Sequence, residues 1–291
     1  MADVALTFDC ADSTLVGILS VPERVATRYG VCLVVGGPQY RVGSHRQFQL
    51  LARALAARGI PVLRFDYRGQ GDSAGEYRGF EDVGDDIRAA IDCLMNRCPT
   101  VESVILWGLC DGASAALLYA ARDARVGGLA LVNPWITGAA TQAQTMLKHY
   151  YGKRILDPEF WGKLLRGRIS IGKVVLEYLS FWRRARDRSA SHAQRADEFT
   201  QDGTPFQRRM LLGAERWHQP MLLITSGDDL TAAEFLDVTC KDPAWLAALG
   251  KAALTRQHLA DADHTFSRKS WQTQLENWTS EWILAQPNAR S

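Results

Sequence analysis

The sequence predicts an α/β fold built on a mostly parallel sheet, and three observations point to it. Short apolar runs recur along the chain, helical stretches separate them, and one run ends in a glycine-flanked turn before a helix. Strands that alternate with helices require right-handed crossover connections, which make neighbouring strands parallel. The 291 residues are 47% hydrophobic and 23% charged, so the chain can bury a large core without a second independent fold.

The N-terminal part predicts an antiparallel hairpin with strands at Val4–Asp9 and Leu15–Val21. Five further apolar runs predict the other strands, because each is short and bounded by turn residues. They are Gly30–Val35, Val62–Asp66, Ser103–Trp107, Gly128–Asn133 and Met221–Ser226. The predicted helices are Phe48–Arg58, Val83–Asn96, Ala113–Arg122 and, close to the C-terminus, Trp271–Ile283.

The alternation of strands and helices stops in residues 135–216, which are rich in aromatic and basic side chains. We interpret this segment as a mainly helical cap inserted into a core of residues 1–134 and 217–291. Since it follows the carboxyl end of a strand, the cap would shape a pocket there and exclude water. Trp135, at its start, is a candidate substrate contact.

The turn Gly108-Leu-Cys-Asp-Gly112 is the first candidate functional feature. Glycines on both sides let a strand turn abruptly into a helix, so that the central side chain projects above the edge of the sheet. That side chain is Cys110, a candidate nucleophile. The amide of Asp111 would lie at a helix N-terminus, where it can stabilise an oxyanion. A small buried cysteine without a chemical role is the alternative.

Two aspartates follow the apolar run Met221–Ser226, at the edge of the sheet where parallel strands end. Asp228 and Asp229 are therefore both candidates for the acid of a catalytic triad, and a turn or helix-capping aspartate is the alternative. His264 comes later, in a polar turn ahead of the last helix, which suits a mobile general base. Along the chain, the candidate nucleophile comes first, the candidate acid second and the candidate histidine last.

Four segments together resemble the α/β-hydrolase superfamily and, within it, the exosortase A system-associated hydrolases of type 1. They are Val34–Ser44, Arg64–Ser73, Gly108–Ser114 and Ser226–Phe235. The resemblance implies an α/β-hydrolase fold over nearly the whole chain and favours Asp229, since these proteins place the acid a few residues after a strand-terminal glycine. It also implies a hydrolase or acyl transferase associated with bacterial surface-polysaccharide or protein-sorting gene clusters. A cysteine at this turn is similar to dienelactone hydrolase and certain thioesterases.

The resemblance further implies a second oxyanion donor in the loop after Val35, where many relatives have His-Gly followed by an amide donor. This chain has Gly36-Gly-Pro-Gln-Tyr40 there, and proline has no N–H. We favour the amide of Gln39 as the donor, with the Tyr40 amide or a side chain as alternatives. Tyr40 and Arg41 are candidate substrate contacts, and Arg41 would anchor an anionic part of the substrate.

We therefore expect an acyl-transfer enzyme in which His264, oriented by Asp229, deprotonates Cys110 for attack on an ester or thioester. The acyl-cysteine intermediate is itself a thioester, so an acyltransferase with an alcohol or amine acceptor is a close alternative. A noncatalytic hydrolase-fold binding or scaffold protein is the alternative of another class. The cysteine in place of serine and the proline at position 38 favour this noncatalytic alternative.

Composition restricts the partners. A net charge of +2 argues against a dedicated nucleic-acid binder. The six cysteines form no CxxC pair and have no ligand spacing with histidine, so we expect reduced thiols, no metal and no cofactor. No signal peptide or membrane-spanning run is recognisable, which predicts a cytoplasmic protein. The expected partner is a small-molecule or carrier-bound acyl substrate, and the oligomeric state stays open, with a homodimer as one option.

Overall fold

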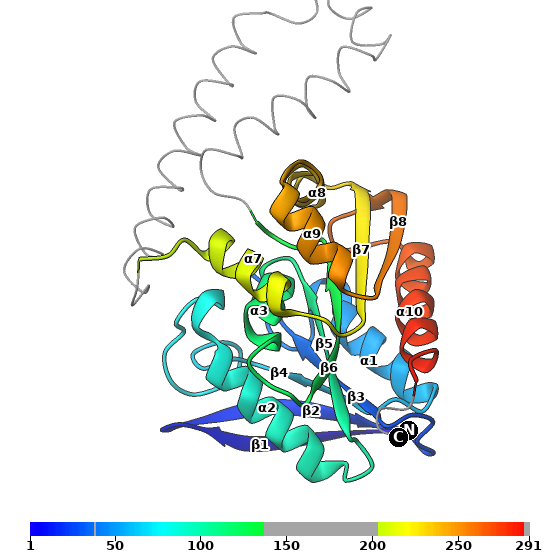
Figure 1. Ribbon diagram of the computed structural model, residues 1–291. Helices are drawn as coiled ribbons and strands as arrows, with labels where there is room; N and C mark the ends of the chain where they lie inside the picture. Colours follow the sequence, from blue (N-terminus) through cyan, green and yellow to red (C-terminus); the bar gives the residue numbers. More distant parts are fainter. Residues whose placement is uncertain (38, 137–202, 288–291) are drawn as a thin grey trace, which may run out of the picture. The chain divides into compact units, whose positions relative to one another are not determined.

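The computed structural model describes residues 1–37, 39–136 and 203–287. Its centre is an eight-stranded sheet with the order β1-β2-β4-β3-β5-β6-β7-β8 (Figure 1). The strands are β1 Ala2–Cys10, β2 Ser13–Val21, β3 Tyr29–Val34, β4 Val62–Phe65, β5 Ser103–Leu109, β6 Val126–Val132, β7 Met221–Asp228 and β8 Leu254–Asp263. β2 pairs antiparallel with β1 and β4, and all other pairs are parallel. The predicted α/β-hydrolase fold is confirmed.

The described α-helices are α1 Gln47–Ala57, α2 Gly84–Arg97, α3 Asp111–Ala120, α7 Phe206–Arg216, α8 Leu230–Lys241, α9 Pro243–Lys251 and α10 Lys269–Leu284. Two short 3-10 helices, η1 Ser44–Arg46 and η2 Phe80–Asp82, precede α1 and α2. Helices α1 and α10 contact each other beside the sheet, and α3 contacts both α2 and α7 (Figure 1). No described helix is long and apolar enough to span a membrane.

Every residue of β3, β4 and β5 is buried, which explains why these strands are continuous apolar runs in the sequence. β1 and β8 form the two edges, and most of their residues are exposed or half-buried. The parallel strands all have their carboxyl ends on the same side of the sheet, and the loops that carry the candidate site residues begin there.

Most of the predicted cap, residues 135–216, lies outside the described residues. The core unit comprises Met1–Ile136 and Phe206–Ser291. Residues 206–216 form α7, which packs against α3 and α9 within that unit. Helix α7, which lies within the range predicted for the cap, is thus part of the core unit through its contacts with α3.

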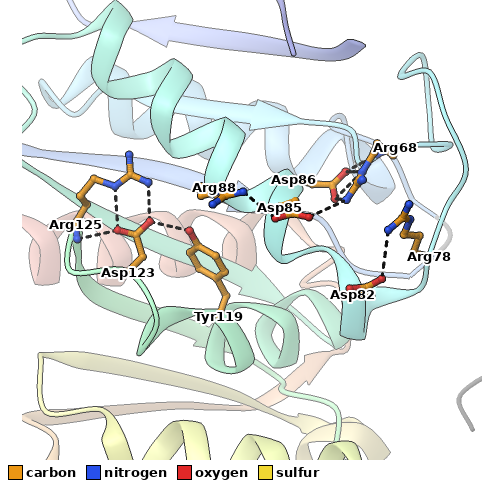
Figure 2. A network of polar contacts seen from close by, with 9 residues as sticks. All are labelled: Arg68, Arg78, Asp82, Asp85, Asp86, Arg88, Tyr119, Asp123 and Arg125. Carbon is orange, nitrogen blue, oxygen red and sulfur yellow. Dashed lines mark hydrogen bonds and ion pairs between the residues drawn. The ribbon is translucent and has the colours of Figure 1, made fainter. Parts of the chain in front are cut away.

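A buried ion pair fastens the loop after β4 to helix α2, as Figure 2 shows. The Arg68 guanidinium donates to both carboxylate oxygens of Asp86 on α2, with an Nη2–Oδ2 distance of 2.7 Å, and the two side chains are 6% and 2% exposed. A second cluster closes the end of α3, where Asp123 accepts from Tyr119 and Arg125. Replacing one residue of the buried Arg68–Asp86 pair by a neutral residue would leave the charge of the other uncompensated in the interior.

Candidate active site

Cys110 stands at the apex of a strained turn between β5 and α3. Its φ of 60° and ψ of −127° lie outside the regions that most side chains adopt. The flanking glycines are required by space, because a Cβ on Gly108 would approach the Ala113 nitrogen to 2.5 Å. A Cβ on Gly112 would approach the Val34 carbonyl oxygen to 2.4 Å. This is the geometry that the sequence predicts for a nucleophile turn.

Backbone hydrogen bonds hold Cys110 in that conformation. Its N–H donates to the Val132 carbonyl at 3.0 Å, and its carbonyl accepts from the Trp135 N–H at 3.2 Å. The Cys110 side chain is partly buried, whereas four of the other five thiols are fully buried and Cys240 is exposed. Cys110 is thus the described thiol that is both accessible and fixed at the sheet edge.

Asp229 follows β7 directly and caps α8. Its carboxylate accepts from the amides of Thr231 and Ala232, each at 3.1 Å. The same carboxylate lies 2.9 Å from Nδ1 of His264, and the Asp229 side chain is only 6% exposed. Asp228 is the last residue of β7 and lies opposite Asp263 of β8. Of the two predicted acids, it is Asp229 that the fold brings to His264, and it serves as a helix cap as well.

His264 lies in the turn that follows β8. Asp263 organises this turn by accepting from the amides of Thr265 and Ser267. Burial lowers the pKa of His264, but hydrogen bonds and charge interactions with Asp229 and Cys110 outweigh it and raise the pKa to about 10. The imidazole therefore contacts the candidate acid on one side and the candidate nucleophile on the other.

The Asp111 side chain was not predicted to have a part in the site. Its carboxylate accepts the N–H of Gly37, in the loop after β3. Burial raises the pKa of Asp111 to about 6, although hydrogen bonds from the amides of Gly37, Gly112 and Asp111 itself act in the opposite direction. The carboxylate thus accepts from amides at the predicted oxyanion hole, and the Asp111 amide, which is the predicted donor, is one of them. The sequence feature that could have indicated this role is the acidic residue directly after the candidate nucleophile.

The other predicted oxyanion donor is Gln39. Its side-chain oxygen accepts from the Ser44 amide at 2.9 Å, which ties the loop to η1. Pro38, whose missing N–H raised the question of the second donor, lies outside the described residues.

Two of the predicted substrate contacts lie next to each other in this loop. Tyr40 is 46% exposed, and the Arg41 guanidinium stands 5.7 Å from the centre of its ring. Arg41 also pairs with the buried carboxylate of Asp66 and with Asp72. The positive charge of Arg41 is therefore already neutralised within the loop, which sequence alone could not show because the partners lie after the next strand.

Trp135, the third predicted substrate contact, belongs to an aromatic cluster beside the nucleophile turn. Its ring stacks on Phe206 at 5.2 Å and meets the edge of Phe80 at 5.4 Å. Phe80 and Phe206 were not predicted as site residues, since they come from η2 and α7. Among the residues that the structure describes, no group of three His, Cys, Asp or Glu side chains is arranged to hold a metal ion.

Comparison with solved structures finds the same fold in several hydrolases. An esterase from Pyrococcus furiosus superposes with a TM-score of 0.63 at 17% identity, covering 97% of this chain and 89% of that one. A serine hydrolase without lid from Xanthomonas campestris gives 0.55 at 20% identity, covering 99% and 98%. A dienelactone hydrolase from Anabaena variabilis gives 0.59 at 16% identity, covering 97% of each chain.

A search of the curated proteins finds no match. The family model for serine aminopeptidase, S33, matches residues 41–234, which include the nucleophile turn and the candidate acid. The description of this family names a serine, whereas the turn of this chain carries Cys110. Because the match spans more than half of the sequence, the protein belongs to the serine aminopeptidase S33 family of α/β-hydrolase enzymes.

Proposed function

We propose that this enzyme cleaves an ester or thioester by acyl transfer through an acyl-cysteine intermediate, with Cys110, His264 and Asp229 as its triad. The observation that carries the proposal is the contact of His264 with both partners. Its Nδ1 lies 2.9 Å from the Asp229 carboxylate, and its interaction with Cys110 contributes to its raised pKa. A nucleophile, a base and a group that orients the base are the three parts that covalent acyl transfer needs.

In the proposed first step, the proton of the Cys110 thiol already lies on Nε2 of His264, as the raised pKa of the imidazole favours, and the sulfur attacks the carbonyl carbon of the substrate. The electron pair of the C=O bond moves to oxygen, and the amide of Asp111 at the start of α3 stabilises the resulting oxyanion. We assign the second donor to the Gln39 amide. Collapse of the tetrahedral intermediate breaks the bond to the leaving group, which receives the proton from His264.

In the second step, an acceptor loses its proton to His264 and attacks the acyl-cysteine. Water gives the free acid, and an alcohol or amine gives a transferred acyl group, with the Cys110 thiolate as leaving group in both cases. Because the intermediate is a thioester, its formation from a thioester substrate is close to balanced in free energy. This favours thioester donors and makes acyl transfer the second candidate function.

The aromatic cluster of Trp135, Phe80 and Phe206 supports an apolar acyl group as substrate, since it borders the nucleophile turn. We propose that the inserted segment within residues 135–216 acts as a cap on this site. The narrower resemblance to exosortase-associated hydrolases is also part of the proposal, and the genes that neighbour this one in its genome would test it.

The proposed function is tested by incubating the protein with a panel of acyl thioesters and recording its intact mass. We expect one acyl adduct on the unmodified chain and on Cys240→Ser, which removes the exposed thiol. Cys110→Ala should form no adduct, and His264→Ala should form it much more slowly. Decay of the adduct with and without an added alcohol or amine separates hydrolysis from transfer. No adduct with any thioester, or an adduct that persists in Cys110→Ala, would contradict the proposal.

A further inference from the structure

We propose that Asn133 is a positioning residue that connects segments that carry two triad members and lie beside the third. This inference rests on the proposed function and adds to it a residue that acts through the backbone of the others. Asn133 directly follows β6 and is fully buried. In the sequence it is the polar residue that ends an apolar strand.

The backbone of Asn133 adopts an unusual conformation. Its φ is 43°, in the left-handed region, which asparagine tolerates better than other residues with a Cβ. Its N–H donates to the Ile224 carbonyl of β7 at 3.0 Å. A left-handed residue at this point turns the chain out of the sheet and leaves the side chain in the interior, between β6 and the loops that follow β7 and β8.

The side-chain amide of Asn133 uses both of its N–H groups and its oxygen. Nδ2 donates to the Ser226 hydroxyl at 2.7 Å and to the backbone carbonyl of His264 at 3.0 Å. Oδ1 accepts from the Ser226 amide at 2.8 Å. Two donors and one acceptor in this arrangement are what an asparagine supplies and what neither a carboxylate nor an aliphatic side chain can supply.

The bonds of Asn133 connect segments that carry two triad members and lie beside the third. His264 is held directly, through its own carbonyl. Ser226 lies in β7, three residues before Asp229. Cys110 is bonded by the neighbours of Asn133 in the chain, since Val132 accepts its N–H and Trp135 donates to its carbonyl. One buried residue therefore joins the end of β6 to β7 and to the turn after β8.

The consequence for catalysis is geometric. The turn that carries His264 follows an edge strand in which only one residue is fully buried, so contacts made by the turn itself help to fix its position. The bond from Asn133 fixes the backbone of the histidine at the place where the ring must contact both Asp229 and Cys110. Without this hydrogen bond, the imidazole of His264 could still accept and donate a proton, but it would no longer be aligned with Asp229 and Cys110.

The test uses Asn133→Asp, which keeps the shape and the acceptor for the Ser226 amide but replaces the donor to the His264 carbonyl by an oxygen. The acylation rate at saturating thioester should fall by about 100-fold, with the half-saturating concentration little changed, because a displacement of roughly 1 Å can have that effect. In proton NMR, the downfield resonance of the His264 Nδ1 proton should shift or disappear. Neither change is expected from a loss of stability alone.

The matched control is Thr225→Val, which removes a buried hydroxyl next to Ser226 that bonds His258 of β8 at 3.0 Å and none of the triad. It should lower the thermal stability but leave the acylation rate and the His264 resonance close to those of the unmodified protein. If Asn133→Asp does not fold, Ser226→Ala serves as the second variant, since it removes one of the two acceptors of Nδ2. A smaller fall in the saturated rate is expected there.

The proposal about Asn133 is overturned if the folded variant acylates at the unmodified rate with an unchanged His264 resonance. The same holds if Thr225→Val is as slow as Asn133→Asp. Failure of the proposed function would look different, because the unmodified protein itself would then form no acyl adduct. In that case the His264 resonance alone still decides whether Asn133 positions the histidine.

Discussion

Replacing Asp229 by asparagine removes the charge next to His264 and turns one of the two carboxylate oxygens into an NH2 group. The carboxylate lies 2.9 Å from Nδ1 of the imidazole and is 6% exposed, so solvent screens it weakly. Asparagine keeps one oxygen, which can accept from the amide of Thr231 or of Ala232, so one of the two hydrogen bonds that cap α8 is retained. We therefore expect Asp229→Asn to fold and to acylate slowly.

The size of the effect follows from the pKa of His264. Burial lowers this pKa, but Asp229 and Cys110 together raise it from 6.5 to about 10. One pKa unit corresponds to about 1.4 kcal/mol, so the raised pKa favours the charged imidazolium by about 5 kcal/mol beyond its ordinary balance, after the opposing effect of burial. If half of this comes from Asp229, its loss is about 2 to 3 kcal/mol, or roughly a 30- to 150-fold slower acylation.

The assay is a single-turnover measurement of acyl-enzyme formation with excess thioester, and Asp228→Asn is the matched control. Stability gives a second readout. A histidine whose folded pKa is raised stabilises the fold fully below its unfolded pKa, and this contribution is lost as the pH rises through the folded value. The unmodified protein should therefore lose stability relative to Asp229→Asn between about pH 7 and pH 10. An Asp229→Asn variant that acylates at the normal rate, or an Asp228→Asn variant that is equally slow, would refute the reasoning.

Three further predictions concern neighbouring residues. Burial raises the pKa of Asp111 to about 6, so this carboxyl destabilises the fold increasingly as the pH rises from its unfolded pKa of 3.8 through 6. Asp111→Asn should be more stable by about 1 to 3 kcal/mol at pH 8 and show little difference at pH 4 in urea titrations. Asp86→Ala leaves the buried Arg68 with only the exposed carboxylate of Asp85, at 4.0 Å, and should lower the free energy of unfolding by about 3 to 5 kcal/mol, also measured in urea, while an equal stability would show that the pair contributes nothing. Gly112→Ala places a methyl group 2.4 Å from the Val34 carbonyl oxygen, so we expect loss of acylation with thioesters even where the variant folds, and normal acylation would contradict the turn geometry.

The central strands and the nucleophile turn could be predicted from the sequence because their causes are local. Strands buried on both faces must be apolar throughout, as in β3 and β5, and a sharp turn needs small residues on both sides of Cys110. The edge strand β8 is not among the predicted strands, because only one of its residues is fully buried and its apolar signal is weak.

The contacts within the site depend on which loops the fold brings together. The sequence places Asp228 and Asp229 side by side and cannot say which one turns toward His264; capping of α8 decides it. In the same way, Arg41 reads as a free cation in the sequence and is paired with Asp66 once the loops are folded. The role that we infer for Asn133 depends on three segments that are distant in the sequence: the end of β6, strand β7 and the turn after β8. No local sequence pattern indicates that these segments meet.

The central claim is that Cys110 is a nucleophile activated by His264, and the rate at which iodoacetamide alkylates each cysteine tests it most directly. Peptide mass mapping over time separates Cys110 from Cys240, the exposed thiol that serves as an internal reference. We predict that at pH 7 Cys110 reacts much faster than Cys240 in the unmodified protein and that His264→Ala removes this difference. Equal rates at the two cysteines, or a fast Cys110 that does not depend on His264, would contradict the account.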